Sequence, residues 1–155
     1  MASTITAATM TVTVTESINL NGQNQGATNT LSLASIAEVS KRIVNVPASE
    51  VEIVAMSTAV AAGTFVESTV KYIRITNLDD TNHVVLTFKS EGNHEFAVKL
   101  DKGQTFIYNG DISGGVVDTM DASGSALSLA LEDLVNITAL ADTAACDLEV
   151  FVAST

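Results

Sequence analysis

A strict alternation of apolar and polar side chains is the feature that most constrains how this chain folds. It is clearest in "TMTVTVTES", Thr9 to Ser17, where Met10, Val12 and Val14 fall on one side of an extended chain. A period of two residues is typical of a β-strand with one covered face. The opposite side consists of threonines, namely Thr9, Thr11, Thr13 and Thr15.

The alternation recurs along the chain in short runs. Val84, Leu86 and Phe88 share one face of "HVVLTFK". One face of "CDLEVFV" likewise carries Leu148, Val150 and Val152. Runs of this kind, at roughly 8–12-residue spacing with turn residues between them, are typical of β-sandwiches and barrels. We therefore predict an all-β, single-domain β-sandwich of jelly-roll-like form over residues 1–155, with about eight to ten strands.

Turn residues mark where the strands are expected to end. Asn21-Gly22 suits the positive φ angles of a tight hairpin turn, and Gly103 in "DKGQ" suits a left-handed turn position. Pro47 lies where a strand is expected to stop, because proline cannot donate to a sheet ladder. "NITAL" and "CDLEVFV" are predicted to form a closing hairpin around "ADTAA".

Two segments also fit a short helix. "SLASIAEVSKR" places Ser35 and Glu38 at the spacing of a capping box, and "LSLALEDLV" has room for a short helical turn. Neither segment is long enough to change the fold class. The prediction therefore includes at most one or two short helices.

The chain is strongly acidic, with a formal net charge of -11 although only 16% of its residues are charged. Binding to nucleic acid or to anionic membranes needs clustered lysine and arginine, so neither partner is expected. Much of the surface has to be small and polar, and such side chains lose little entropy when a neighbour covers them. The start "MASTITAATM" lacks the regions of a signal peptide and no apolar run is long enough to span a bilayer, so we expect a soluble protein made inside the cell.

Few residues suggest catalysis. Cys146 could serve as a nucleophile with His83 or His94 as base, but it lies in register with Leu148 on an apolar strand face, which favours a buried core side chain. The two histidines are expected at the surface. None of the common nucleophile, metalloprotease or phosphate-binding motifs occurs in the sequence. We predict no enzymatic activity and no cofactor.

Two groups of oxygen ligands beside turn residues suit Ca²⁺ in their chemistry. The first group is Asp79, Asp80 and Asn82, and the second is Asp111, Asp118 and Asp121. Neither has the alternating spacing of a calcium-binding loop, and clusters of Asp, Asn and Gly are ordinary in turns. We predict no metal site.

Several stretches of the second half resemble a family of small virion structural proteins from tailed phages. "YIRITNL" is similar to the family's strand of the form "yIRItN", an aliphatic strand follows, "FAVKLDKGQTF" is similar to "F.v.L..GqtF", and "LEVFV" is similar to a short C-terminal strand. These stretches are Tyr72 to Leu78, Val84 to Phe88, Phe96 to Phe106 and Leu148 to Val152. The first half is similar only in its threonine- and valine-rich style.

Within this family, capsid decoration (cement) proteins agree best in size and composition. The resemblance implies a jelly-roll-like subunit on the capsid surface of a virion, made in the host cytoplasm. It also implies homo-oligomers, preferably trimers, that bind the outside of the assembled capsid, bridge neighbouring major capsid proteins and stabilise the particle. Its motifs carry no catalytic residues.

The threonine side of the first strand then has a candidate role. The edge strand of a lone subunit usually carries lysine, proline or a bulge, and Thr4 to Thr15 contains neither charge nor proline. We expect residues 1–15 to be an assembly segment that contacts a neighbouring subunit or the shell, with an interface at Thr9, Thr11, Thr13 and Thr15. The alternative is an inner strand of the chain's own sandwich.

Arg42 and Arg74 are further candidate interface residues. They belong to a small basic minority on predicted strands. They either neutralise nearby carboxylates or contact an acidic partner or a second copy of the chain, and both alternatives stay open.

Two other functions are alternatives to capsid decoration. One is another virion component, such as a tail, fibre or head-tail connector protein, although no repeats of the kind found in fibres occur in the sequence. The other is a carbohydrate-binding β-sandwich module. Such modules usually present aromatic platforms, and this chain has no Trp and only Tyr72 and Tyr108.

Overall fold

The computed structural model describes residues 4–109 and 131–155. Within these ranges the chain forms thirteen strands and no helix, and three of the strands, β2, β3 and β7, have two residues each. The predicted all-β class is confirmed. No helix in the described ranges is long and apolar enough to cross a membrane.

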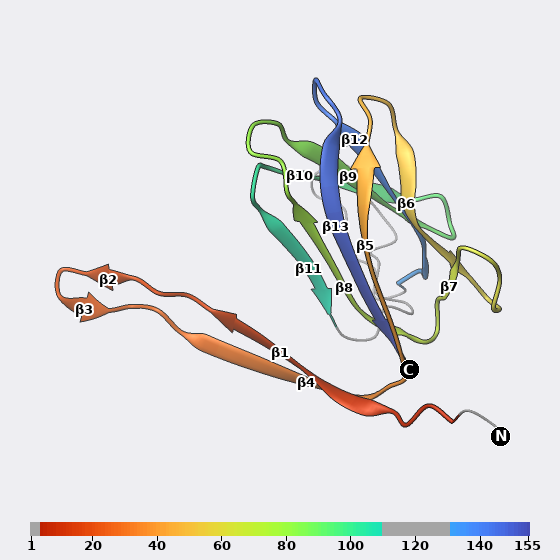
Figure 1. Ribbon diagram of the computed structural model, residues 1–155, viewed down its shortest axis with the longest axis horizontal. Coiled ribbons are helices and arrows are strands. Elements are labelled where there is room, and N and C mark those ends of the chain that lie inside the picture. The colour runs from red at the N-terminus through yellow and green to blue at the C-terminus, as the bar shows by residue number, and fades with distance from the viewer. Residues whose placement is uncertain (1–3, 110–130) are drawn as a thin grey trace.

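Nine strands pack as two layers (Figure 1). The five-stranded sheet has the order β10 (Glu95–Leu100), β9 (Val84–Ser90), β12 (Leu134–Ala141), β6 (Val51–Ser57) and β7 (Phe65–Val66). The four-stranded sheet has the order β11 (Thr105–Asn109), β8 (Val70–Asn77), β13 (Cys146–Ser154) and β5 (Glu38–Val46). All neighbouring strands are antiparallel except β6 and β7.

The strand order is that of a jelly roll. When the eight longer strands of the two layers are numbered along the chain from β5 to β13, the sheets have the orders 1-8-3-6 and 2-7-4-5. Two four-stranded sheets interleaved in this way form the double Greek key of jelly rolls. The predicted jelly-roll-like sandwich is therefore confirmed.

The core lies between the two layers. Phe88 stacks on Phe96 with 4.8 Å between ring centroids, and the ring of Phe106 lies 4.9 Å from it. The inward faces predicted from the alternation are confirmed, because their side chains are buried: Val84, Leu86, Phe88, Leu148, Val150 and Val152. Each such side chain contributes about 1.5–3 kcal/mol through burial.

The predicted turns are also confirmed. Asn21 and Gly22 have φ angles of 51° and 78°, as a two-residue hairpin turn requires, and Gly103 has a φ of 69°. β5 ends at Val46, directly before Pro47.

The predicted closing hairpin is wrong. β12 pairs with β6 and β9, whereas β13 pairs with β5 and β8, so "ADTAA" connects one layer with the other. Both strands turn apolar side chains toward the same core. Alternation alone is therefore compatible with a hairpin and with a crossing between layers.

The optional helix at residues 32–42 is absent, because these residues belong to β4 (Thr28–Ile36) and β5, joined by Ala37. Ser35 has a φ of 62° where β4 has one more residue than its partner strand, so the residue belongs to a β-bulge and does not cap a helix. Pairing with other strands outweighs the local capping pattern. In the second optional segment, residues 127–130 lie outside the described residues, and β12 begins at Leu134.

A long hairpin projects from the sandwich (Figure 1). β1 (Ala8–Thr15) pairs with β4, and β2 (Asn19–Leu20) pairs with β3 (Gln23–Asn24). Between these pairs Glu16 N donates to Ala27 O at 2.9 Å and Gln25 N donates to Ile18 O at 3.0 Å, so the ladder continues to the Asn21-Gly22 turn. We call residues Ala8–Ile36 the arm. Since β1 belongs to neither layer, the alternative of an inner sandwich strand is wrong.

Candidate assembly interface

The arm has two chemically different faces. Val12 lies opposite Leu31, and Thr13 lies opposite Thr30. Because opposed residues of antiparallel strands share a face, one face is apolar, with Met10, Val12, Val14, Leu31 and Leu33. The other, which we call the threonine face, carries Thr11, Thr13, Thr15, Thr28, Thr30 and Ser32.

The base of the apolar face covers part of the sandwich. Met10, Val12 and Leu33 pack against a small cluster that also contains Ile36, Tyr72, Ala153 and Phe151. Tyr72 and Phe151 lie on the side of the four-stranded sheet that faces away from the core, which we call the outer face, and their rings meet edge to face at 5.9 Å. The side chain of Tyr72 is therefore buried although it lies on the opposite side of its strand from the core residues.

The threonine face is exposed. Thr9, Thr11, Thr13 and Thr15 are all exposed, and the hydroxyls of Thr15 and Thr28 lie 3.2 Å apart across the two strands. A groove of about 340 Å³ remains between the base of the arm and the outer face, where Arg74 is one of the lining residues. The role of these threonines in an interface stays a prediction.

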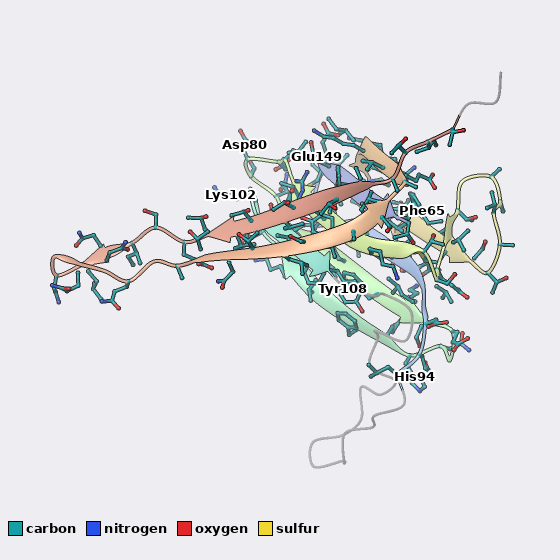
Figure 2. The ribbon with its side chains drawn as sticks, turned by 90° about the horizontal axis from the view of Figure 1, so that it is seen from below. Phe65, Asp80, His94, Lys102, Tyr108 and Glu149 are labelled. Atoms are coloured by element: carbon teal, nitrogen blue, oxygen red, sulfur yellow. The ribbon has the colours of Figure 1, made fainter. Side chains whose placement is uncertain are left out.

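Beyond its base, the apolar face of the arm is uncovered. Val14, Ile18 and Leu20 are 40%, 52% and 59% exposed. Figures 1 and 2 show this part of the arm lying clear of the sandwich. In the described residues both outer edges of the β1–β4 ribbon are unpaired, and isolated two-stranded ribbons are marginally stable in water. An arm of this kind gains stability when a partner covers it.

The arm is almost uncharged. Its single charged residue is Glu16, and the first basic residue of the chain is Lys41, beyond its end. Nearly all of the net charge of -11 therefore belongs to the remainder of the chain. Open strand edges in monomeric proteins usually carry lysine or proline against unwanted pairing, and the arm has neither.

The outer face carries a charged cluster around Glu149. Arg74 Nη2 lies 2.5 Å from Glu149 Oε1, and Lys41 Nζ lies 3.0 Å from Glu149 Oε2. Arg74 also donates to Thr76 Oγ1 at 2.8 Å and lies 5.7 Å from the centroid of the Phe151 ring. Hydrogen bonds from Arg74 first and Lys41 second hold the pKa of the Glu149 carboxyl below its ordinary value. Arg74 thus neutralises a neighbouring carboxylate, and a further contact with a partner stays a prediction.

Arg42 lies on β5, at the open edge of the four-stranded sheet. Its guanidinium donates to the backbone carbonyl of Ile53 on β6. The side chain therefore points between the two layers, as charged residues on edge strands often do. A contact between Arg42 and a partner stays a prediction.

The first group of candidate cation ligands forms a hydrogen-bonded turn. Asp79 Oδ1 accepts the backbone N–H groups of Thr81 at 2.8 Å and Asn82 at 2.5 Å. These bonds, that of Asn82 first, lower the pKa of the Asp79 carboxyl. The second group, Asp111, Asp118 and Asp121, lies outside the described residues. Within residues 4–109 and 131–155, no three acidic, histidine or cysteine side chains are arranged to hold a metal ion.

Cys146 is buried in the core, as predicted, and its thiol donates to Ala144 O at 3.5 Å. Burial is the main cause that raises the pKa of this thiol, which disfavours the reactive thiolate. His83 Nδ1 lies 3.6 Å from Asp142 Oδ2, and both side chains are partly exposed. The geometry of Cys146 is that of a packing residue.

Sequence reasoning missed two features. The first is a cluster at the β9–β10 turn, where Glu132 Oε2 accepts Ser90 Oγ–H and Gly92 N–H and lies 2.9 Å from His94 Nδ1. Glu132 is distant in sequence from this turn, so no local pattern reveals the cluster. The second is the apolar patch under the arm: Tyr72 and Phe151 interrupt the polar outer sides of their strands, a pattern that could have indicated a covered outer face.

Comparisons with known proteins place the chain in no family. No family model matches it, and no curated protein matches its sequence. A solved structure described as "Bacillus endospore appendages form a novel family of disulfide-linked pili" superposes with a TM-score of 0.46 and 9% sequence identity, over 100% of this chain and 96% of that chain. Similarity this low carries no conclusion about function.

Proposed function

We propose that this protein is a non-enzymatic structural subunit of a phage virion, a capsid decoration protein. It binds the outside of the assembled capsid in the host cytoplasm and bridges neighbouring major capsid proteins. The single observation that carries the proposal is the arm, a hairpin with one charged residue, whose outer edges are unpaired in the described residues and whose apolar end is exposed. Such a segment is stable in a chain whose neighbours cover it permanently.

The resemblance of residues 72–78, 84–88, 96–106 and 148–152 to virion structural proteins supports the same proposal. A jelly roll hosts many functions, so the fold on its own does not select this one. On a symmetric shell, many copies share the load, and weak individual contacts are sufficient for stable attachment. We expect homo-oligomers with closed symmetry, preferably trimers.

Counting copies on isolated particles tests the proposal. A decoration protein should be present at about one copy per major capsid protein, whereas roughly six to eighteen copies per particle would indicate a tail or connector component. Cryo-electron microscopy of the same particles should show the protein on the outer capsid surface. Its absence from the capsid would overturn the proposal.

Reconstitution provides the second test. The purified full-length protein should bind particles that lack it and raise the temperature at which they release DNA. As a matched control, the same particles are incubated with the variant Val14→Asp, Ile18→Asp, which places charges on the uncovered end of the arm. Equal protection by both proteins would show that the arm does not contribute to attachment or bridging.

A further inference from the structure

The open edge of β5 presents an apolar, basic, apolar triplet. Among residues 4–109 and 131–155, β5 pairs with β13 on one side and has no strand partner on the other. Val39, Lys41 and Ile43 alternate along it, so their side chains share the outer face. Val39 and Ile43 are 55% and 63% exposed, and the Lys41 side chain is also largely exposed. Exposed aliphatic side chains on both sides of a lysine are unusual on an edge strand that has no partner.

The arm presents the complementary triplet. Val14, Glu16 and Ile18 are alternate residues of one hydrogen-bonded ladder, and all three are exposed. Glu16 is the single charge of the arm. β4 occupies one edge of β1, and the other edge of β1 is unpaired in the described residues.

We propose that the free edge of β1 in one copy adds to the open edge of β5 in a second copy. In the antiparallel arrangement Glu16 lies opposite Lys41, which places Val14 opposite Ile43 and Ile18 opposite Val39. Main-chain hydrogen bonds supply affinity in such strand addition, and the three side-chain pairs set its register. The inference deepens the proposed structural function, on which it rests for the expectation that copies assemble.

The geometry favours a second copy over the chain's own β5. β4 leads into β5 through Ala37, so the arm folds away from the point where β5 begins. Glu16 follows the end of β1, and Figure 1 shows the arm beyond β1 lying clear of the sandwich and of β5. The arm therefore extends toward a neighbour.

Charge favours the same arrangement. Outside their arms, two copies of the chain are both acidic and repel each other. The arm carries a single charged residue, Glu16, which lies opposite a lysine in this arrangement. Lys41 contacts Glu149 at 3.0 Å in the single chain, and Arg74 keeps Glu149 neutralised when Lys41 turns to Glu16. The contact is heterologous, so repeated copies close into a ring if the rotation permits.

Cysteine cross-linking tests the contact directly. The full-length variants Glu16→Cys and Lys41→Cys are purified separately, mixed and oxidised, and disulfide-linked dimers are measured on non-reducing gels. The expected result is rapid dimer formation in the mixture. The control pairs Thr13→Cys, on the threonine face, with Lys41→Cys. Cross-linking that is no faster with Glu16→Cys than with Thr13→Cys would overturn the inference.

Charge reversal provides the second test, with self-association of the folded proteins measured by analytical ultracentrifugation. Glu16→Lys and Lys41→Glu should each weaken self-association roughly tenfold, and a mixture of the two variants should associate more tightly than either alone. Lys102→Glu makes the same charge change on an exposed turn and should leave association unchanged. Circular dichroism verifies folding of each variant.

The outcomes separate this inference from the proposed function. Unchanged self-association in both single variants would overturn the inference, whether or not the protein binds capsids. If the mixture restores association but the wild-type protein does not bind capsids, the inference holds and the capsid proposal fails.

Discussion

Arg74 on β8 and Glu149 on β13 form an ion pair on the outer face, with 2.5 Å between Nη2 and Oε1. Lys41 on β5 reaches the second carboxylate oxygen at 3.0 Å. One carboxylate thus connects the side chains of three neighbouring strands beside the docked base of the arm. Because the hydrogen bonds favour its charged form, this carboxylate contributes to the dependence of stability on pH.

We expect Glu149→Gln to reduce the loss of stability in acid. The pKa of Glu149 is lower in the folded protein than its ordinary value of 4.5, so its contribution is present above that value and is lost as the pH falls through the folded-state pKa. Calorimetry between about pH 3 and 7 should show a smaller fall of the unfolding temperature in the variant than in the wild type. The control is Glu38→Gln, at an exposed position of β5. Parallel curves for Glu149→Gln and the wild type would contradict the expectation.

Phe88→Ala should destabilise the sandwich strongly. The side chain is buried between the rings of Phe96 and Phe106, and its removal leaves a cavity that these rings cannot fill. The free energy of unfolding in denaturant should fall by about 3–5 kcal/mol. Thr87→Ala, on the other side of the same strand, should cost less than about 1 kcal/mol. Similar losses for both variants would show that Phe88 is not a core residue.

Gly26→Ala should disorder the end of the arm and leave the jelly roll intact. A Cβ atom at residue 26 would lie 2.1 Å from the backbone oxygen of Glu16, a contact that requires the strands to separate. Hydrogen exchange should show lost protection of the Glu16 and Gln25 amides, with unchanged protection in β8 and β13. Ala27→Ser, at the adjacent exposed position, serves as control. Full protection of both amides in Gly26→Ala would refute the close approach.

Leu33→Asp should release the base of the arm from the outer face. Leu33 packs against the cluster around Tyr72 and Phe151, and an aspartate there would place a charge in an apolar contact. Limited proteolysis should cut the arm of this variant several-fold faster than that of the wild type. Ser32→Asp adds the same charge on the threonine face and should leave the rate nearly unchanged. Equal acceleration in both variants would mean that the apolar face does not hold the arm.

The strands, several turns and the core faces could be predicted from the sequence. Alternation places Val84, Leu86 and Phe88 on one side because β-strands have a period of two, and Asn21-Gly22 permits the positive φ angles that few other pairs tolerate. The optional helix near Ser35 was not realised, because capping spacing is a local preference that strand pairing outweighs. The predicted closing hairpin was wrong because alternation does not distinguish pairing from a crossing between layers.

The candidate interface was predicted only in part. The lack of charge and proline in β1 indicated an unusual strand, and the structure places its threonines at the surface. The sequence did not reveal that β4 pairs with β1 to form the arm, or that the apolar base of the arm packs on Tyr72 and Phe151. It also did not reveal that Val39 and Ile43 remain exposed. These features depend on contacts between residues far apart in the chain.

The sequence by itself determined which side chains share a face, where several turns fall, and how the charge is distributed along the chain. The tertiary structure alone decided which surface covers each face. Period-two alternation assigns residues to the two sides of a strand but does not specify what covers either side. In the structure β1 pairs with β4 and packs against β8 and β13. The exposed end of the apolar face, from Val14 to Leu20, could be recognised only from the structure, because the structure shows that the outer face covers the base of the arm and not its end.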